Sequence, residues 1–133
     1  YCAIMTSANT NSTPIIDFRD ENNASKLKIQ ADGRGLSEFT AKAWVNFNGT
    51  STVAIRDSHY ISSITDGGTG YYHANFTGNL GTNYAVTLNS LPTSDGAERI
   101  KLSGLETGRV SMNNEVPGST DYDTTIAIAM IFG

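Results

Sequence analysis

The chain has 133 residues, a formal net charge of −4 and an isoelectric point near 4.9. This length suffices for one domain with its own core and is too short for two of full size. The nine Lys and Arg residues are scattered singly and no apolar run reaches the roughly 20 residues that span a bilayer, so the sequence predicts neither a nucleic-acid partner nor membrane insertion.

The N-terminal part predicts a lead-in followed by a β-hairpin. Residues 1–13 contain few core-forming side chains, whereas Pro14–Phe18 and Ser25–Gln30 have strand character and flank a turn at Asp20–Asn23. An isolated hairpin is only marginally stable, so we expect this one to be supported by further structure. We assign residues 1–36 to an N-terminal unit. Because the chain begins with a tyrosine and lacks a signal-peptide pattern, we expect it to be part of a longer protein.

Residues 37–133 predict an all-β domain. Short runs alternate apolar with polar residues between turn signals, and no segment keeps a helical period. The two clearest runs, Ala41–Phe47 and Gly70–Thr77, place one apolar set inward: Ala41, Ala43, Val45, Phe47, Tyr72, Ala74 and Phe76. Tyr84–Leu88 repeats the pattern, while Glu98–Leu102 and Arg109–Met112 are weaker strands. We predict an antiparallel, jelly-roll-like β-sandwich.

The last run, Thr124–Phe132 (TTIAIAMIF), is apolar on both faces. Its two alternating sets are Ile126, Ile128, Met130 and Phe132 on one face and Ala127, Ala129 and Ile131 on the other. A strand of this kind is covered on both sides. We favour contact with another copy of the chain, because small side chains let two backbones approach, and name Ala127, Ala129 and Ile131 as interface candidates. A central strand that is fully internal is the alternative.

The residues give little support to an enzyme or a metalloprotein. The single cysteine, Cys2, excludes an intrachain disulfide and lies in a Ser/Thr/Asn-rich segment that favours no reactive thiol. His59 and His73 lack the spacing of a metal motif. The carboxylates that could pair for glycoside hydrolysis are Asp121 with Asp123, and Asp17, Asp20 and Glu21. Such carboxylates in loops are usually solvated, so we predict no catalytic residue, no metal and no cofactor.

The outward residues after the Asp66–Gly70 turn are the strongest binding candidates. The turn (DGGTG) leads into a strand rather than a helix, so it predicts a hairpin and not a phosphate-binding loop. Tyr71, His73 and Asn75 then combine an exposed aromatic ring with hydrogen-bonding groups, as sugar-binding sites do. Packing of these three residues against a neighbouring subunit or the N-terminal hairpin is the alternative.

Several segments together resemble a recurrent domain of tailed-bacteriophage virion proteins, seen near the C-termini of tail fibres of marine and cyanobacterial phages. The resembling segments are Ala41–Thr50 (AKAWVNFNGT), Ile61–Gly70 (ISSITDGGTG), Tyr72–Thr77 (YHANFT), Asn83–Val86 (NYAV) and Ala127–Gly133 (AIAMIFG). Asp17–Gly35 is similar to segments that join a fibre shaft to its head. The chain departs from the family's pattern at Tyr71 and His73.

The resemblance implies a trimeric tip domain in the virion, preceded by a shaft-end hairpin. The protein would be synthesised in the host cytoplasm, would assemble with other virion proteins and would adsorb to host-surface polysaccharide. The family supplies no catalytic residues to carry over. The alternative is a capsid decoration or head-fibre protein that stabilises the shell and binds no ligand of its own. In either case we expect Trp44 to be covered at a subunit interface or under the N-terminal hairpin.

Overall fold

The computed structural model describes residues 14–30, 35–37, 40–91, 98–116, 118 and 121–133, with the backbone alone for Pro14, Ile15 and Leu36. The described residues form strands and no helix, so no helix within these ranges is long and apolar enough to cross a membrane. They separate into two compact units, one reaching Lys42 and including Gly133, the other Ala43–Phe132. The predicted division at residues 36/37 lies slightly earlier in the chain.

The N-terminal unit contains the predicted hairpin and one further strand. Strands β1 (Pro14–Arg19), β2 (Ser25–Gln30) and β3 (Gly35–Leu36) form an antiparallel sheet in the order β1-β2-β3. Asp20 stabilises the β1–β2 turn, because its Oδ1 accepts the backbone N–H groups of Asn22 and Ala24, both at 2.9 Å. The third strand was not predicted, and it gives the hairpin the additional support that we expected.

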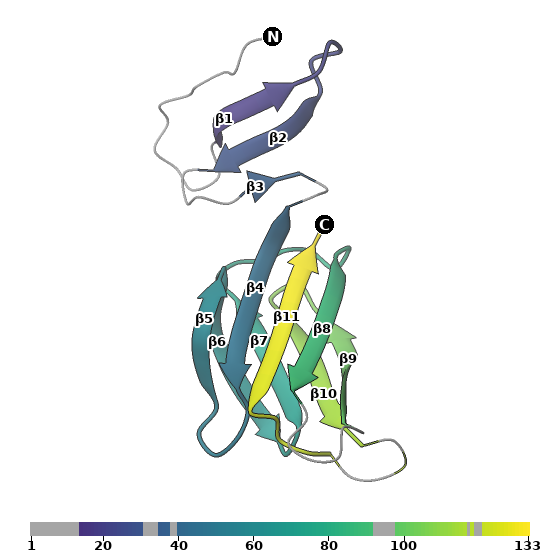
Figure 1. Ribbon diagram of the computed structural model, residues 1–133. Coiled ribbons are helices and arrows are strands. Elements are labelled where there is room, and N and C mark those ends of the chain that lie inside the picture. Colours follow the sequence, from purple (N-terminus) through teal and green to yellow (C-terminus); the bar gives the residue numbers. More distant parts are fainter. Residues whose placement is uncertain (1–13, 31–34, 38–39, 92–97, 117, 119–120) are drawn as a thin grey trace. The chain divides into compact units, whose positions relative to one another are not determined.

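The larger unit is a β-sandwich of two four-stranded sheets, which confirms the predicted fold class (Figure 1). Its strands are β4 (Ala41–Asn48), β5 (Ala54–His59), β6 (Ile61–Gly68), β7 (Tyr71–Phe76), β8 (Ala85–Leu91), β9 (Arg99–Leu105), β10 (Arg109–Glu115) and β11 (Ile126–Phe132). One sheet has the order β5-β4-β11-β8 and the other β6-β7-β10-β9. We call them the β11 sheet and the β7 sheet.

Both local and distant pairings build these sheets. The hairpins β4–β5, β6–β7 and β9–β10 each stay within one sheet, while β4–β11 and β7–β10 join strands far apart in the sequence. Tyr60, with φ of 58°, is the single residue between β5 and β6 and passes the chain from one sheet to the other. The sandwich thus shares the eight strands and two sheets of a jelly roll, with mostly local hairpins as its connections.

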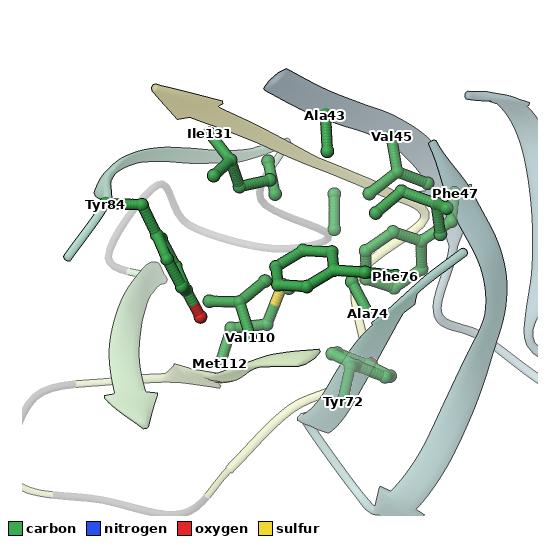
Figure 2. Close-up of a cluster of buried hydrophobic side chains, with 13 residues drawn as sticks. Ala43, Val45, Phe47, Tyr72, Ala74, Phe76, Tyr84, Val110, Met112 and Ile131 are labelled. Atoms are coloured by element: carbon green, nitrogen blue, oxygen red, sulfur yellow. The ribbon is translucent and has the colours of Figure 1, made fainter. Parts of the chain in front are cut away.

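The core lies between the two sheets and contains the predicted inward residues of β4 and β7 except Ala41, which is half-buried (Figure 2). The buried apolar side chains are Ala43, Val45, Phe47, Ile61, Tyr72, Ala74, Phe76, Tyr84, Val110, Met112, Ala127, Ala129 and Ile131. The Phe47 and Tyr72 rings, one from each sheet, meet edge to face with centroids 5.2 Å apart. This burial supplies the main driving force for folding of the unit.

The structure shows that the predicted roles of the two faces of β11 were wrong. Ala127, Ala129 and Ile131 have no exposed surface within a single chain, because β11 is a central strand and this face lies in the core. These three residues are therefore not available to another subunit. The face left uncovered carries the other alternate set, in which Met130 is 39% exposed.

A buried hydroxyl joins the two sheets at one end of the core. The Tyr72 hydroxyl on β7 lies 3.1 Å from the carbonyl oxygen of Gly49, just after β4, and 3.0 Å from Oδ1 of Asp123. The same Asp123 oxygen accepts the backbone N–H of Gly70 at 2.8 Å. Burial and the nearby Asp123 carboxylate raise the pKa of Tyr72 far above its usual value, so this hydroxyl stays protonated and remains a donor.

Gly70 is required at the end of this network for two separate reasons. Its φ is 69°, and a Cβ there would lie 2.5 Å from the backbone oxygen of Asn114. Gly81 has a similar φ of 76° but open space around it. Alanine substitutions at these two glycines therefore separate the free-energy cost of a left-handed backbone from that of a steric overlap.

We expect Gly81→Ala to lower the unfolding free energy by about 1 kcal/mol, from the backbone term alone. Gly70→Ala adds a steric overlap with main-chain atoms, which cannot move aside by changing rotamer. We therefore expect it to lower the unfolding free energy by about 3 kcal/mol or more. Urea unfolding followed by the fluorescence of Trp44, the only tryptophan, measures both variants within the sandwich. Equal losses for the two variants would contradict the overlap.

Candidate functional site

The outer face of the β7 sheet carries a polar surface organised in three cross-strand rows. The strand register defines them as Gly68, Tyr71, Asn113 and Lys101 in the first row, Thr65, His73, Ser111 and Gly104 in the second, and Ser63, Asn75 and Arg109 in the third. The predicted residues Tyr71, His73 and Asn75 thus occupy one position in each row. Their outward direction is confirmed, since they alternate with the buried Tyr72, Ala74 and Phe76.

Tyr71 and His73 form an aromatic pair on this face. Their ring centroids are 4.9 Å apart and their planes meet at 81°, an edge-to-face arrangement. Both side chains are half-buried. The pair therefore holds the Tyr71 ring in a defined place while part of it remains open to solvent.

His73 is tied into a chain of polar side chains. Its Nδ1 lies 2.7 Å from Oγ of Ser111, and Oγ of Ser111 lies 3.4 Å from Oε1 of Glu106. The same Glu106 oxygen accepts from Nε of Arg109 at 2.8 Å. Ser111 is only 2% exposed, so its hydroxyl supports the imidazole and is closed to a substrate as a nucleophile.

Burial and neighbouring charges shift the pKa values of His73 and Glu106. Burial lowers the pKa of His73 below that of an exposed imidazole, and the nearby Arg109 guanidinium lowers it further. The hydrogen bond from Arg109 holds the pKa of Glu106 below its usual value. At neutral pH the pair of Glu106 and Arg109 is therefore charged, and His73 is neutral.

Asn75 is engaged within the sheet itself. Its Nδ2 donates to Oγ of Ser63 at 3.0 Å and to Oγ1 of Thr65 at 2.9 Å, both on the neighbouring strand β6. These bonds occupy the donors of the amide. Asn75 therefore contributes more to the register of β6 on β7 than the sequence indicated.

An open recess of about 640 Å³ lies at the first row, next to the β6–β7 turn. The described residues that line it are Gly67, Gly68, Thr69, Tyr71, Asn113 and Asp121. Of these residues, only Tyr71 was predicted from the sequence to bind a ligand. Asn113 was missed because the weak alternation of β10 does not show which of its residues face outward or which strand lies beside it.

Asn113 is the unusual residue of the recess. Its Oδ1 is buried and has no hydrogen-bond partner, although most buried polar atoms in proteins have one. Asn113 is paired in register with Tyr71 across β10 and β7, so the two side chains are neighbours on the outer face. The structure thus places an unsatisfied acceptor, itself covered by protein atoms, beside the partly exposed aromatic ring.

The carboxylates and histidines considered for catalysis or metal binding do not converge. Asp123 accepts from Gly70 and Tyr72, as described above, while Asp121 is exposed beside the recess. Asp17 belongs to the N-terminal unit, where Arg19 lies 2.8 Å from its carboxylate. His59 and His73 lie in different sheets. Over the ranges that the structure describes, no three His, Cys, Asp or Glu side chains gather into a possible metal site.

The outer face of the β11 sheet carries an apolar stripe along β11, flanked by polar residues such as Asn46 on β4 and Thr87 and Asn89 on β8. Its described apolar residues are Trp44 on β4, Leu91 on β8 and Ile126, Ile128, Met130 and Phe132 on β11. Leu91 is 54% exposed, and with Ile126 and Ile128 it borders a mainly apolar groove of about 310 Å³. Trp44 is half-buried and alternates with the core residues Ala43 and Val45. We call this surface the apolar face.

Comparisons of this chain with protein-family models, with curated proteins and with solved structures found no match. The resemblance to phage virion domains therefore stays a prediction that rests on the sequence segments alone.

The lowered pKa of His73 predicts a pH-dependent stability. As the pH falls through 6.5, the unfolded chain takes up a proton at this histidine and the folded chain does not, so the unfolding free energy decreases until the pH reaches the lower pKa of the folded state. His73→Gln removes this contribution and leaves His59 in place. We expect urea unfolding between about pH 5 and 8 to show a flatter profile for the variant. Parallel profiles would contradict the assignment.

Proposed function

We propose that the chain is a non-enzymatic receptor-binding domain of a bacteriophage tail fibre, which adsorbs to host-surface glycan through the outer face of the β7 sheet. The observation that carries the proposal is the partly exposed Tyr71 ring, held edge to face by His73 beside a polar recess. The resemblance of the sequence to phage tail-fibre tips supports the virion assignment.

The geometry suits the recognition of sugars. An aromatic ring can stack on the apolar face of a pyranose, while neighbouring amide and carboxylate oxygens accept hydrogen bonds from its hydroxyl groups. Tyr71 supplies the ring, and the exposed Asp121 supplies a carboxylate acceptor at the same recess. A ring that is already held in place loses little conformational entropy when a ligand binds.

We further propose that the domain assembles as a homotrimer through the apolar face. Six apolar residues lie on one outer sheet surface, and Met130 is 39% and Leu91 54% exposed. Such a patch is often covered in assembled proteins. A second copy of the chain is the occupant that the resemblance supports. Trp44 at this face agrees with the expectation that it contacts another subunit, whereas Ala127, Ala129 and Ile131 have no part in the contact.

A capsid decoration protein is the second candidate, and the apolar face is the observation that favours it. The same surface could attach the domain to a shell protein, and the β7 sheet would then have no ligand. Labelled antibodies on whole virions separate the two candidates in the electron microscope. Label at the tail tips supports the fibre, and label over the capsid supports decoration.

Removal of the Tyr71 ring tests the glycan-binding proposal. We expect Tyr71→Ala to weaken binding to an array of bacterial surface polysaccharides about tenfold, which corresponds to about 1.4 kcal/mol. Phe18→Ala is the matched control, because it removes a ring that is 45% exposed in the N-terminal unit. Unchanged binding by the Tyr71 variant, or an equal loss in both, would contradict the assigned site.

A charge placed on the apolar face tests assembly. We expect the unaltered chain to sediment as a trimer at micromolar concentration, and Met130→Asp to sediment as a monomer because a desolvated carboxylate is costly at an interface. Trp44→Ala should weaken assembly before it weakens glycan binding. Ser103→Asp adds the same charge at an exposed position of the β7 sheet and should remain trimeric. A monomeric unaltered chain would overturn the assembly proposal.

A further inference from the structure

We infer that two copies of the chain pair through strand β8, edge to edge and antiparallel, so that their β11 sheets join across a twofold axis. This contact goes beyond the proposed function, because it involves the edge of the β11 sheet rather than the recess or the centre of the apolar face. Three observations carry it. The edge of β8 is unprotected, two leucines beside it face the core layer without being covered, and the sequence of β8 complements its own copy.

Strand β8 lacks the features that keep sheet edges from pairing. It pairs with β11 over all of Ala85–Leu91 without a register shift, and it contains no charged residue and no proline. Each of the other three edge strands, β5, β6 and β9, has a register shift in its pairing and contains charged residues. The charged residues are Arg56 and Asp57 on β5, Asp66 on β6, and Arg99 and Lys101 on β9. Charges and bulges prevent edge-to-edge pairing, and β8 has neither.

The main-chain groups of β8 have a defined direction at this edge. Oγ1 of Thr124, just before β11, donates to the carbonyl oxygen of Leu91 at 2.8 Å, so this carbonyl is turned towards β11. Main-chain groups of successive residues in a strand point to opposite sides, hence those of Val86, Leu88 and Ser90 are turned away from β11. Within the described part of the chain these groups have no main-chain partner. A second strand alongside β8 would satisfy them.

Two leucines next to this edge face the layer between the sheets and remain open to water. Leu102 on β9 pairs in register with Met112, a core residue, and Leu105 pairs likewise with Val110. Both leucines therefore point inward. Leu102 is nevertheless 44% exposed and Leu105 39%, because β8 and β9 end their sheets at the same side of the sandwich (Figure 1). A strand added to β8 extends that sheet beyond β9, and its inward side chains cover these leucines.

A second copy of β8 is the strand that fits this edge. Antiparallel pairing about Leu88 places Ala85 opposite Leu91 of the second copy. It also places Thr87 opposite Asn89 of the second copy. Apolar side chains thus meet apolar ones, and a hydroxyl meets an amide with which it can form a hydrogen bond. Because β8 is uncharged, no charged side chain is brought against its own copy.

Self-association of the Met130→Asp chain tests the pairing, because this variant is expected to lose assembly through the apolar face and keeps the sequence of β8. Two paired strands form a contact smaller than a standard interface, so we expect dimers with a dissociation constant of about 100 µM. Sedimentation of the full chain over a range of concentrations around that value measures it. In hydrogen-exchange NMR, the amides of Val86, Leu88 and Ser90 should gain protection as the concentration rises.

Charges placed on β8 test the register. Thr87→Lys brings two lysines close across the axis and Asn89→Asp two carboxylates, so we expect each to weaken dimers of the Met130→Asp chain about tenfold or more. An equal mixture of the two variants sets the new ammonium opposite the new carboxylate and should restore dimers. Ala54→Lys is the matched control, because it adds a charge at an exposed position of β5, the other edge of the same sheet, and should dimerise normally. Unfolding curves followed by Trp44 fluorescence show whether each variant is folded.

Three results would overturn the inference: a Met130→Asp chain that stays monomeric at every concentration, dimers that survive Thr87→Lys, and protection confined to residues outside β8 and β9. Protection that appears only after a different protein is added would assign the edge to that protein and also overturn the pairing of copies. None of these results bears on glycan binding, which the Tyr71→Ala comparison tests separately.

Discussion

The buried hydroxyl of Tyr72 is the contact on which the arrangement of this domain depends. It lies between β7, the residue that follows β4 and the segment that leads into β11, so one side chain connects both sheets. A hydroxyl in a largely apolar core is stable only when its partners are in place, which makes the network cooperative. Because side chains alternate along a strand, an inward Tyr72 also forces Tyr71 and His73 outward. The interior therefore determines the orientation of the candidate site.

The two outer faces of the sandwich differ in chemistry although both are built from antiparallel strands. The β7 sheet satisfies most of its outward polar groups by cross-strand bonds, as at His73 and Asn75. The β11 sheet instead exposes apolar side chains such as Met130 and Leu91. An antiparallel sheet with one solvated face normally alternates apolar and polar residues, so β11 departs from the rule that β7 follows. This contrast is the observation on which the proposal of separate binding and assembly surfaces rests.

Alternation in the sequence predicted the strands whose two faces differ strongly in polarity, β4 and β7 above all. It did not predict β6, where Ser62 and Ser63 interrupt the pattern between Ile61 and Ile64 and the strand depends on pairing with β7. Nor could it choose the buried face of β11, since small alanines suit a core and an interface equally. The site was predicted in part: the direction of Tyr71 follows from local alternation, whereas its neighbour Asn113 is brought there by a long-range register.

The opposite placement of the two faces has a consequence for attachment to a surface. If copies of the domain associate through β11, each one turns its β7 sheet away from its neighbours, so no recess is shared or closed by assembly. The recesses then act as separate sites on one rigid body, and the second and third sugars bind from a high effective concentration. The strength of adhesion would depend on how densely the sugar is displayed more than on the affinity of any single recess.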